Sequence, residues 1–285
     1  MTAGASPALV AGAGGLPKVV LSSFDGARIE VYAHGAHVTS WRAAGSDDER
    51  LFVSPLSHFV EDGAIRGGVP VCFPQFADQG PLPMHGFART RAWGLVSAGR
   101  AEDGAAHARL RLADAADTRA LWPHAFECVL DVVAKGPSLT IELAVVNTGG
   151  QPFDFTAALH TYLRTSDVRT AEVRGLAGAP YRDKVLKRDD EAQRDAVLVV
   201  DRPIDRVYRT VPSVLEVREP RRALEVRARG TTDTVVWNPG PGGPSDLAPD
   251  GYLSMLCVEA AVASTTIALA PGQAWRGAQT LTAVA

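Results

Sequence analysis

The sequence predicts an all-β protein in which large antiparallel sheets pack face to face, most simply as two sheets. Three observations support this prediction: apolar and polar residues alternate over many short segments, turn sequences separate these segments, and helical periodicity is scarce. Such alternation is typical of strands with one buried face. In chain order, the predicted strands cover 18–22, 27–33, 106–112, 126–134, 138–147, 153–163, 215–228, 234–237, 253–261 and 265–269.

The segments between these strands contain recognisable turn chemistry. Asp25-Gly26 and Ala270-Pro271-Gly272 are examples, and strands joined by such short turns pair as antiparallel neighbours. The best helical candidate is short, at 113–121, whereas the charged stretch 182–194 fits either a helix or an exposed loop. Residues 238–251 are rich in Gly and Pro, and we expect a long loop there rather than a domain boundary.

The N-terminal segment differs in composition from the rest of the chain. Residues 1–16 are broken by Gly and Pro and lack the positive start of a signal peptide, so we expect a flexible leader followed by a single domain at 17–285. No window reaches the roughly 18 uninterrupted apolar residues that a membrane-spanning helix needs. The sequence therefore predicts a soluble protein.

Charge and cysteine content exclude several classes of partner. The chain has 29 Lys and Arg against 32 Asp and Glu, a net charge of -3, so it lacks the basic field that nucleic acid or an anionic membrane requires. Its 3 Cys form no CxxC pair, which argues against disulfides and a zinc cage and favours a reducing cytoplasm. His34 and His37 lack a third ligand in sequence, and we predict no metal and no cofactor.

The segment 66–94, RGGVPVCFPQFADQGPLPMHGFARTRAWG, is the strongest candidate for a binding site. Its glycines allow a close backbone approach, its prolines stiffen the chain, and its aromatic residues offer flat apolar surfaces on which sugars stack. Arg66, His85 and Arg89 add donors that suit hydroxyl, carboxylate or phosphate groups. The alternative is a structural loop whose arginines lie in solvent.

Two further residues stand out against an apolar background. His160 shares a predicted strand face with Tyr162 and Arg164, and an imidazole titrates near neutral pH. Glu259 is the one charged residue in LSMLCVEAAVA, where burial would raise its pKa unless donors compensate. His160 can also be read as a satisfied core residue, and Glu259 as half of a structural ion pair. Asp205 lies in RPIDRVY and, taken on its own, would be a surface carboxylate.

Taken in order, RGGVPVCFPQF, HGFAR, LHTYL, DRVY, VVWNP and CVEAA resemble the hexose-6-phosphate mutarotases, or glucose-6-phosphate 1-epimerases, of the aldose epimerase superfamily. The resemblance covers about residues 18–283. It implies the galactose-mutarotase-like β supersandwich and a cofactor-free isomerase that interconverts the α and β anomers of a hexose 6-phosphate, with D-glucose 6-phosphate as the expected substrate.

The resemblance also implies residue roles. His160 corresponds to the family's general acid and Glu259 to its general base, and substrate contacts fall on Arg66, Gln75, His85, Arg89 and Asp205. Epimerases of neutral sugars have an LHGG-like sequence where this chain has HGFAR, so the arginine suggests a 6-phosphate. NPGPGGPSD departs from the family pattern. The alternatives are an epimerase of neutral aldoses and a sugar-binding module without catalysis.

Overall fold

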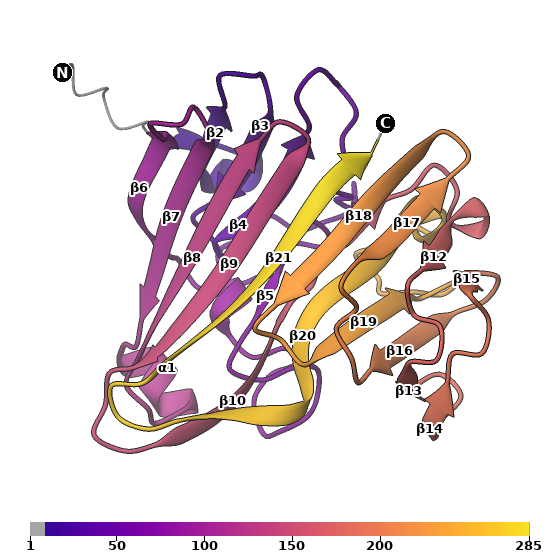
Figure 1. Ribbon diagram of the computed structural model, residues 1–285. Helices are drawn as coiled ribbons and strands as arrows, with labels where there is room; N and C mark the ends of the chain where they lie inside the picture. Colours follow the sequence, from indigo (N-terminus) through magenta and orange to yellow (C-terminus); the bar gives the residue numbers. More distant parts are fainter. Residues whose placement is uncertain (1–8, 285) are drawn as a thin grey trace.

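The computed structural model of the protein describes residues 9–284, which form three antiparallel sheets (Figure 1). This confirms the predicted all-β class with large antiparallel sheets, and it adds a small third sheet to the two expected. Helices are few in the described part of the chain: α1 (Ala116–Leu121) and the short 3-10 turns η1 (Ala13–Gly15), η2 (Ala88–Thr90), η3 (Val168–Thr170) and η4 (Gly251–Ser254). Within residues 9–284, none of these helices has the length and apolar character needed to cross a membrane.

Nine strands form the largest sheet, in the pairing order β15 (Val197–Val199), β12 (Glu172–Arg174), β17 (Leu215–Glu219), β18 (Arg222–Arg229), β21 (Ala274–Val284), β9 (Ser138–Asn147), β8 (Phe126–Lys135), β7 (Ala106–Ala113) and β6 (Gly94–Arg100). Figure 1 shows β7, β8, β9 and β21 side by side as its broad face. The sequence alternation decides which side of this sheet is buried. In β8, Phe126, Cys128 and Leu130 are buried, whereas Glu127 and Asp131 lie on the outer side.

The eight-stranded sheet pairs in the order β14 (Arg188–Ala192), β13 (Pro180–Asp183), β16 (Ile204–Tyr208), β19 (Asp233–Asn238), β20 (Met255–Leu269), β10 (Phe153–Leu159) and β5 (Val71–Cys72), with β11 (Tyr162–Arg164) also on β20. β20 is the central strand and is buried on both faces from residue 255 to 263. A strand in this position is expected to be almost wholly apolar. The carboxyl group of Glu259 is an exception in this strand, and its burial there needs an explanation.

The third sheet has four strands, β1 (Val10–Ala11), β2 (Pro17–Ser22), β3 (Arg28–Tyr32) and β4 (His37–Arg42). β1 pairs with β2, and Leu16 is buried, so residues 10–16 are ordered chain and not the flexible leader that the sequence predicted. The remainder of that expected leader, residues 1–8, lies outside the described residues.

Several predicted segments have different boundaries in the structure. The expected strand at 153–163 is interrupted between β10 and β11, and the one at 215–228 is the hairpin of β17 and β18, because Pro220 cannot donate a ladder hydrogen bond. Conversely, residues 255–261 and 265–269 belong to the single strand β20, while residues 253 and 254 lie in η4. The charged stretch 182–194, predicted as a helix or loop, contains the hairpin of β13 and β14.

The largest hydrophobic cluster includes buried residues from Val19 to Leu281, and three smaller clusters are separate from it. Phe73 lies in the middle of it, with its ring centroid 5.3 Å from that of Phe126 in β8 and 5.4 Å from that of Phe155 in β10. Phe87 is also in this cluster. The segment 66–94 is therefore anchored in the core through its phenylalanines, and its polar residues are held in place between these anchors.

Gly68 allows this segment to pass close to β4. Its φ is +60°, and an added Cβ would lie 2.3 Å from the carbonyl oxygen of Val38. Gly45 has a similar φ of +72° but open space where a Cβ would go. We expect Gly45→Ala to lower the free energy of unfolding by about 1 kcal/mol through backbone strain alone. Gly68→Ala should cost ~2 kcal/mol more because of the clash. Urea unfolding of both variants checks this, and equal losses would contradict it.

Candidate active site

A polar cavity of about 250 Å³ opens beside the inner strands of the eight-stranded sheet. Three groups of residues meet there: the segment 66–89, the strands β16, β19 and β20, and the junction between β10 and β11. The loop between β19 and η4, which the sequence predicted, adds Pro244. Six of the seven predicted site residues line this cavity, namely Arg66, His85, Arg89, His160, Asp205 and Glu259.

His160 and Glu259 are brought together at the base of the cavity. The Nε2 atom of His160 lies 3.5 Å from Oε1 of Glu259, and both side chains are almost fully buried, with 8% and 2% exposed. The Nδ1 atom of His160 and the Oε2 atom of Glu259 are buried without a hydrogen-bond partner among residues 9–284. Buried polar atoms are rarely left unpaired, so both atoms are available to a ligand in the cavity.

The pairing of β20 brings residues distant in sequence into this arrangement. Tyr162 in β11 lies opposite Cys257, and Val235 in β19 lies opposite Glu259. His160 itself stands in the break between β10 and β11, where its backbone N–H donates to the carbonyl of Pro70 at 3.0 Å. The break thus orients the imidazole toward β20 and at the same time ties it to the segment 66–94.

Electrostatics at the site favour the neutral form of each group. Burial raises the pKa of Glu259 well above its ordinary value, and the nearby charge of Asp205 adds to the effect while Lys184 opposes it. Burial likewise lowers the pKa of His160 well below its ordinary value, helped by His85, Arg89 and Arg66. The two groups therefore share one proton over a wide range of pH, as either neutral acid and imidazole or carboxylate and imidazolium.

Tyr162 supports both the histidine and one of the arginines. Its ring stacks on that of His160, with centroids 4.8 Å apart and an interplanar angle of 12°. Its hydroxyl accepts a hydrogen bond of 2.9 Å from Nη1 of Arg66, whose Nε donates to Oδ1 of Asp246 at 2.9 Å. The Arg66 guanidinium is thereby fixed on two sides, and its remaining Nη is left for a ligand.

Arg89 is less committed to the protein than Arg66. Its Nη2 donates to the carbonyl of Met84 at 2.8 Å, and its buried Nε has no hydrogen-bond partner among the described residues. It lies within η2, which directly follows the buried Phe87. A guanidinium held at one corner in this way can offer its other donors to an anionic group in the cavity.

His85 presents a hydrogen-bond donor to the cavity. The backbone N–H of Ala77 donates to Nδ1 of His85 at 3.2 Å, and Sγ of Cys72 lies 3.2 Å from the same atom. Because Nδ1 accepts, the proton resides on Nε2. Burial, followed by the charge of Arg89, lowers the pKa of His85 to about 3, so the ring is neutral near pH 7. Its centroid lies 5.2 Å from that of His160.

Asp205 in β16 forms an ion pair with Lys184, with 3.5 Å between Oδ2 and Nζ. Burial raises the pKa of Asp205, and Lys184 opposes this shift. Sequence reasoning missed Lys184, because it lies in the charged stretch that was read as a helix or an exposed loop. Lys184 directly follows β13, and β13 pairs with β16, which carries Asp205. Without knowledge of this pairing, the sequence gives no sign that Lys184 belongs to the site.

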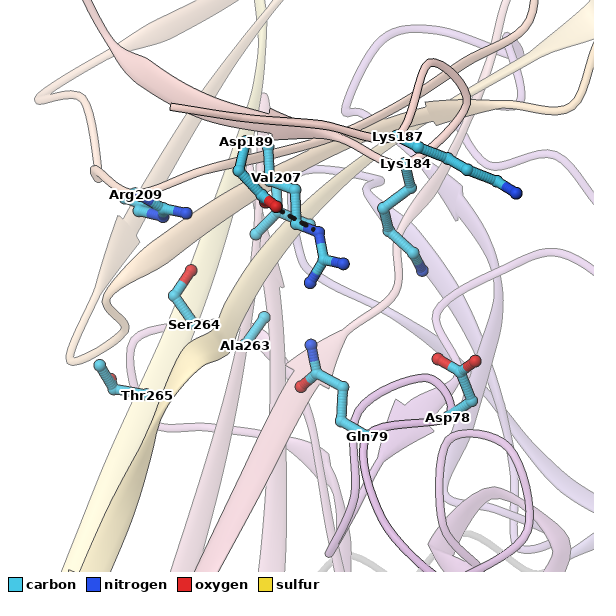
Figure 2. Close-up of a pocket in the computed structure, with 11 residues that line it drawn as sticks. Asp78, Gln79, Lys184, Lys187, Asp189, Val207, Arg209, Ala263, Ser264 and Thr265 are labelled. Atoms are coloured by element: carbon cyan, nitrogen blue, oxygen red, sulfur yellow. Dashed lines mark ion pairs between the residues drawn. The ribbon is translucent and has the colours of Figure 1, made fainter. Parts of the chain in front are cut away.

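A second groove of about 640 Å³ adjoins the cavity and shares Asp78 and Lys184 with it. Figure 2 shows the Lys184 side chain pointing toward Asp78 across this groove. These two residues therefore lie where the cavity and the groove meet. Asp78 was also missed from sequence, since nothing distinguishes it from a solvated turn residue.

Residues 17–282 match the family model described as aldose 1-epimerase. The chain belongs to the aldose 1-epimerase family. A relative from Cenchrus ciliaris, named "Putative glucose-6-phosphate 1-epimerase", is 37% identical over 95% of this chain and 85% of its own length. One of the same name from Escherichia coli K12 is 37% identical over 81% of this chain and 79% of its own. The chain is accordingly an aldose epimerase, an isomerase of sugar anomers.

Solved structures agree with this assignment. A solved structure of a "putative mutarotase" from Salmonella typhimurium has a TM-score of 0.86 and 30% identity, covering 94% of this chain and 90% of its own. A galactose mutarotase related enzyme from Lactobacillus acidophilus has the same fold, with a TM-score of 0.75 and 15% identity over 94% and 97% of the two chains. The predicted galactose-mutarotase-like fold is thus confirmed for this epimerase.

Gln75 differs from the other predicted site residues of this epimerase because it does not line the cavity. Its Nε2 donates to the carbonyls of Ala77 and Leu82 at 3.0 and 3.1 Å, and its Oε1 accepts from the N–H of Leu82 at 3.0 Å. The amide is therefore used to fold the loop that precedes His85. In this geometry Gln75 positions the loop, and its predicted contact with substrate is not present in the cavity wall.

His34 and His37 also serve the backbone. The Nε2 atoms of His34 and His37 lie 2.6 and 2.7 Å from the carbonyl oxygens of Gly63 and Gly67, respectively. Burial lowers the pKa of His37 to about 3, so it is a neutral donor. Among residues 9–284, no cluster of three or more His, Cys, Asp or Glu could hold a metal ion. The two histidines instead support the chain just before and after Arg66.

The buried carboxyl of Glu259 predicts a stability effect with a defined pH dependence. Its pKa in the folded chain lies above the ordinary 4.5, so the folded state holds the proton more tightly than the unfolded state. The contribution of this group to the free energy of unfolding is fully present below pH 4.5. It falls by about 1.4 kcal/mol per pH unit as the pH rises toward the raised pKa. We expect Glu259→Gln to be more stable than wild type at pH 7, with a smaller difference at pH 5. Urea unfolding at both pH values checks this, and a pH-independent difference would contradict it.

Proposed function

We propose that this epimerase interconverts the α and β anomers of a hexose 6-phosphate, with D-glucose 6-phosphate as its substrate. The observation that supports this most directly is the composition of one cavity. It combines the buried pair His160–Glu259 with the guanidinium groups of Arg66 and Arg89. The names of the relatives from Cenchrus ciliaris and Escherichia coli point to the same substrate.

The chemistry that we propose opens and recloses the pyranose ring. Glu259, as carboxylate, takes the proton of the C1 hydroxyl while His160, as imidazolium, donates its proton to the ring oxygen O5. The C1–O5 bond breaks, the C1=O double bond forms, and the aldehyde rotates about C1–C2. Ring closure on the other face of the aldehyde then reverses both proton transfers.

The shared proton of the pair suits this cycle. Ring opening leaves Glu259 protonated and His160 neutral, which are the forms that burial favours. Ring closure returns the carboxyl proton to the C1 oxygen and the O5 proton to the imidazole, so the starting forms of the two groups, 3.5 Å apart, are restored. The pair thus needs no proton from solvent to begin another turnover.

The phosphate would lie at the arginine side of the cavity, and the ring hydroxyls near Asp205. Arg66 offers its remaining Nη, and Arg89 offers the donors that Met84 does not use. Charge-assisted hydrogen bonds to a phosphate dianion are the strong class of such contacts. Asp205, an acceptor when ionised, suits sugar hydroxyls and not phosphate oxygens.

Arg89→Gln tests the phosphate assignment. We expect kcat/KM for glucose 6-phosphate to fall about 10- to 100-fold, because one charge-assisted contact is lost, while kcat/KM for free glucose changes little. NMR saturation transfer between the two anomers measures both. Arg91→Gln is the matched control, since Arg91 pairs with Asp117 and does not line the cavity. If wild type shows equal kcat/KM for glucose and glucose 6-phosphate, the protein is an epimerase of neutral aldoses and these arginines do not read a phosphate.

A further inference from the structure

A second group of cationic side chains lies outside the sugar cavity. It lines an open cleft of about 760 Å³ between the end of β11 and the turn that joins β17 to β18, together with a small adjoining hollow. Both strands flanking that turn are labelled in Figure 1. We call this place the arginine cleft and define it by Arg50, Arg164, Arg221, Arg222 and Glu219. None of these residues lines the sugar cavity.

The backbone and Glu219 hold the arginine cleft in a fixed arrangement. The N–H of Arg164 donates to the carbonyl of Arg50 at 2.9 Å, and Nη2 of Arg222 donates to the carbonyl of Arg164 at 2.6 Å. Oε1 of Glu219 accepts from the backbone N–H and the hydroxyl of Ser166 at 2.6 and 2.5 Å, and its Oε2 accepts from Nε of Arg222 at 2.5 Å. These hydrogen bonds hold three arginines from three separate segments next to one another.

The positive charge of the arginine cleft is only partly balanced. Glu219 pairs with Arg222, and Asp167, the other acidic lining residue, pairs with Arg169. Among residues 9–284, no carboxylate lies within ion-pair distance of Arg50, Arg164 or Arg221. Like charges gathered with few counter-charges repel one another, so a bound anion would stabilise this arrangement.

Arg50 supplies an independent indication of a ligand. Its Nε is buried and has no hydrogen-bond acceptor among the described residues. Burial, and then the charge of Arg222, lower the pKa of Arg50, and the charges of Asp48 and Glu219 oppose this shift only in part. Arg50 lines the small hollow beside the cleft, and an anion bound at that edge of the cleft would compensate its charge. Planar guanidinium groups match the oxygens of phosphate well.

We propose that the arginine cleft binds a small dianionic oxyanion, either inorganic phosphate or the phosphoryl group of a phosphate ester. The unpaired arginines Arg50, Arg164 and Arg221 supply the donors, and Glu219 sets their positions through Arg222. This site is separate from the sugar cavity, and the proposal holds whether or not the protein acts on a sugar phosphate.

The test measures binding of inorganic phosphate by isothermal titration calorimetry at constant ionic strength. The parent protein carries Arg89→Gln, which weakens any phosphate binding in the sugar cavity. We expect the parent to bind phosphate, and Arg50→Gln or Arg164→Gln added to it to weaken this binding at least tenfold. Arg221→Gln should weaken it too, and since Arg221 is exposed its loss cannot unfold the chain. Arg218→Gln, on β17 but outside the cleft, is the control that should change nothing.

A parallel titration with glucose 6-phosphate distinguishes the two sources of the oxyanion. Binding of either probe that is lost in the Arg50, Arg164 and Arg221 variants supports the proposal and identifies which source the cleft accepts. The proposal is overturned if the parent binds neither probe, or if the three variants bind both probes as the Arg218→Gln control does.

Discussion

Glu259→Gln should reduce the exchange between α- and β-glucose 6-phosphate by about 10²- to 10⁴-fold at saturating substrate. The amide has nearly the size of the carboxyl group but cannot accept the proton of the C1 hydroxyl. Its neighbours in β19 and β20 remain apolar, so the substitution leaves the packing intact. NMR saturation transfer, corrected for the spontaneous rate, measures the loss.

A suitable control is Glu225→Gln, which removes an exposed carboxylate that pairs with Arg227 on β18. We expect this control to exchange anomers at the wild-type rate. Because Glu259→Gln is also expected to unfold at higher urea concentration than wild type at pH 7, a folding defect can be separated from a catalytic one. Exchange within a few fold of wild type would remove Glu259 from the proposed mechanism.

The fold class could be predicted from the sequence because most strands have one mainly apolar face and one more polar face. In β8, for example, the apolar residues at 126, 128 and 130 are buried, whereas Glu127, Val129 and Asp131 on the other face are only partly buried. One signal was misread across a chain reversal. Apolar residues alternate at 215 and 217 in β17 and at 224 and 226 in β18, and the change from odd to even positions marks the turn at Pro220 that the sequence reading passed over.

The strands β21 and β6 were not predicted, because their sequences lack a clear alternation. β21 contains Trp275, Arg276 and Gly277, which interrupt the alternation, and it is held by pairing with β9 and β18 on its two sides. β6 is largely exposed at the edge of its sheet, and its residues carry little periodic signal. In both cases the strand state follows from tertiary pairing and not from local preference.

The candidate site was predictable where a residue contradicts its own surroundings. Glu259 stands in an apolar strand, and Arg66 and Arg89 stand in a segment fixed by phenylalanines, so each is conspicuous in the sequence alone. Lys184 and Asp78 are surrounded by other polar residues, and only the pairing of β13 with β16 and the shape of the cavity bring them to the site. The role of Gln75 could not be read either, because its partners are backbone groups of its own loop.

His160→Ala is the second substitution with a large expected effect. The variant lacks the imidazole that we propose protonates O5 when the C1–O5 bond breaks, and we expect anomer exchange to fall about 10²- to 10⁴-fold. Added imidazole should restore part of the rate, since the substitution leaves a space beside Tyr162 and Trp237. His107→Ala is the matched control, because His107 pairs with Asp131 away from the cavity.

The double variant His160→Ala, Glu259→Gln decides whether the two residues act as one unit. If the pair shares a single proton as its 3.5 Å contact indicates, removing the second group should cost far less than removing the first. The exchange rate of the double variant should then lie within about tenfold of either single variant. Losses that multiply would mean that acid and base act in separate steps, and a His160→Ala enzyme with near-normal exchange would exclude His160 as the acid.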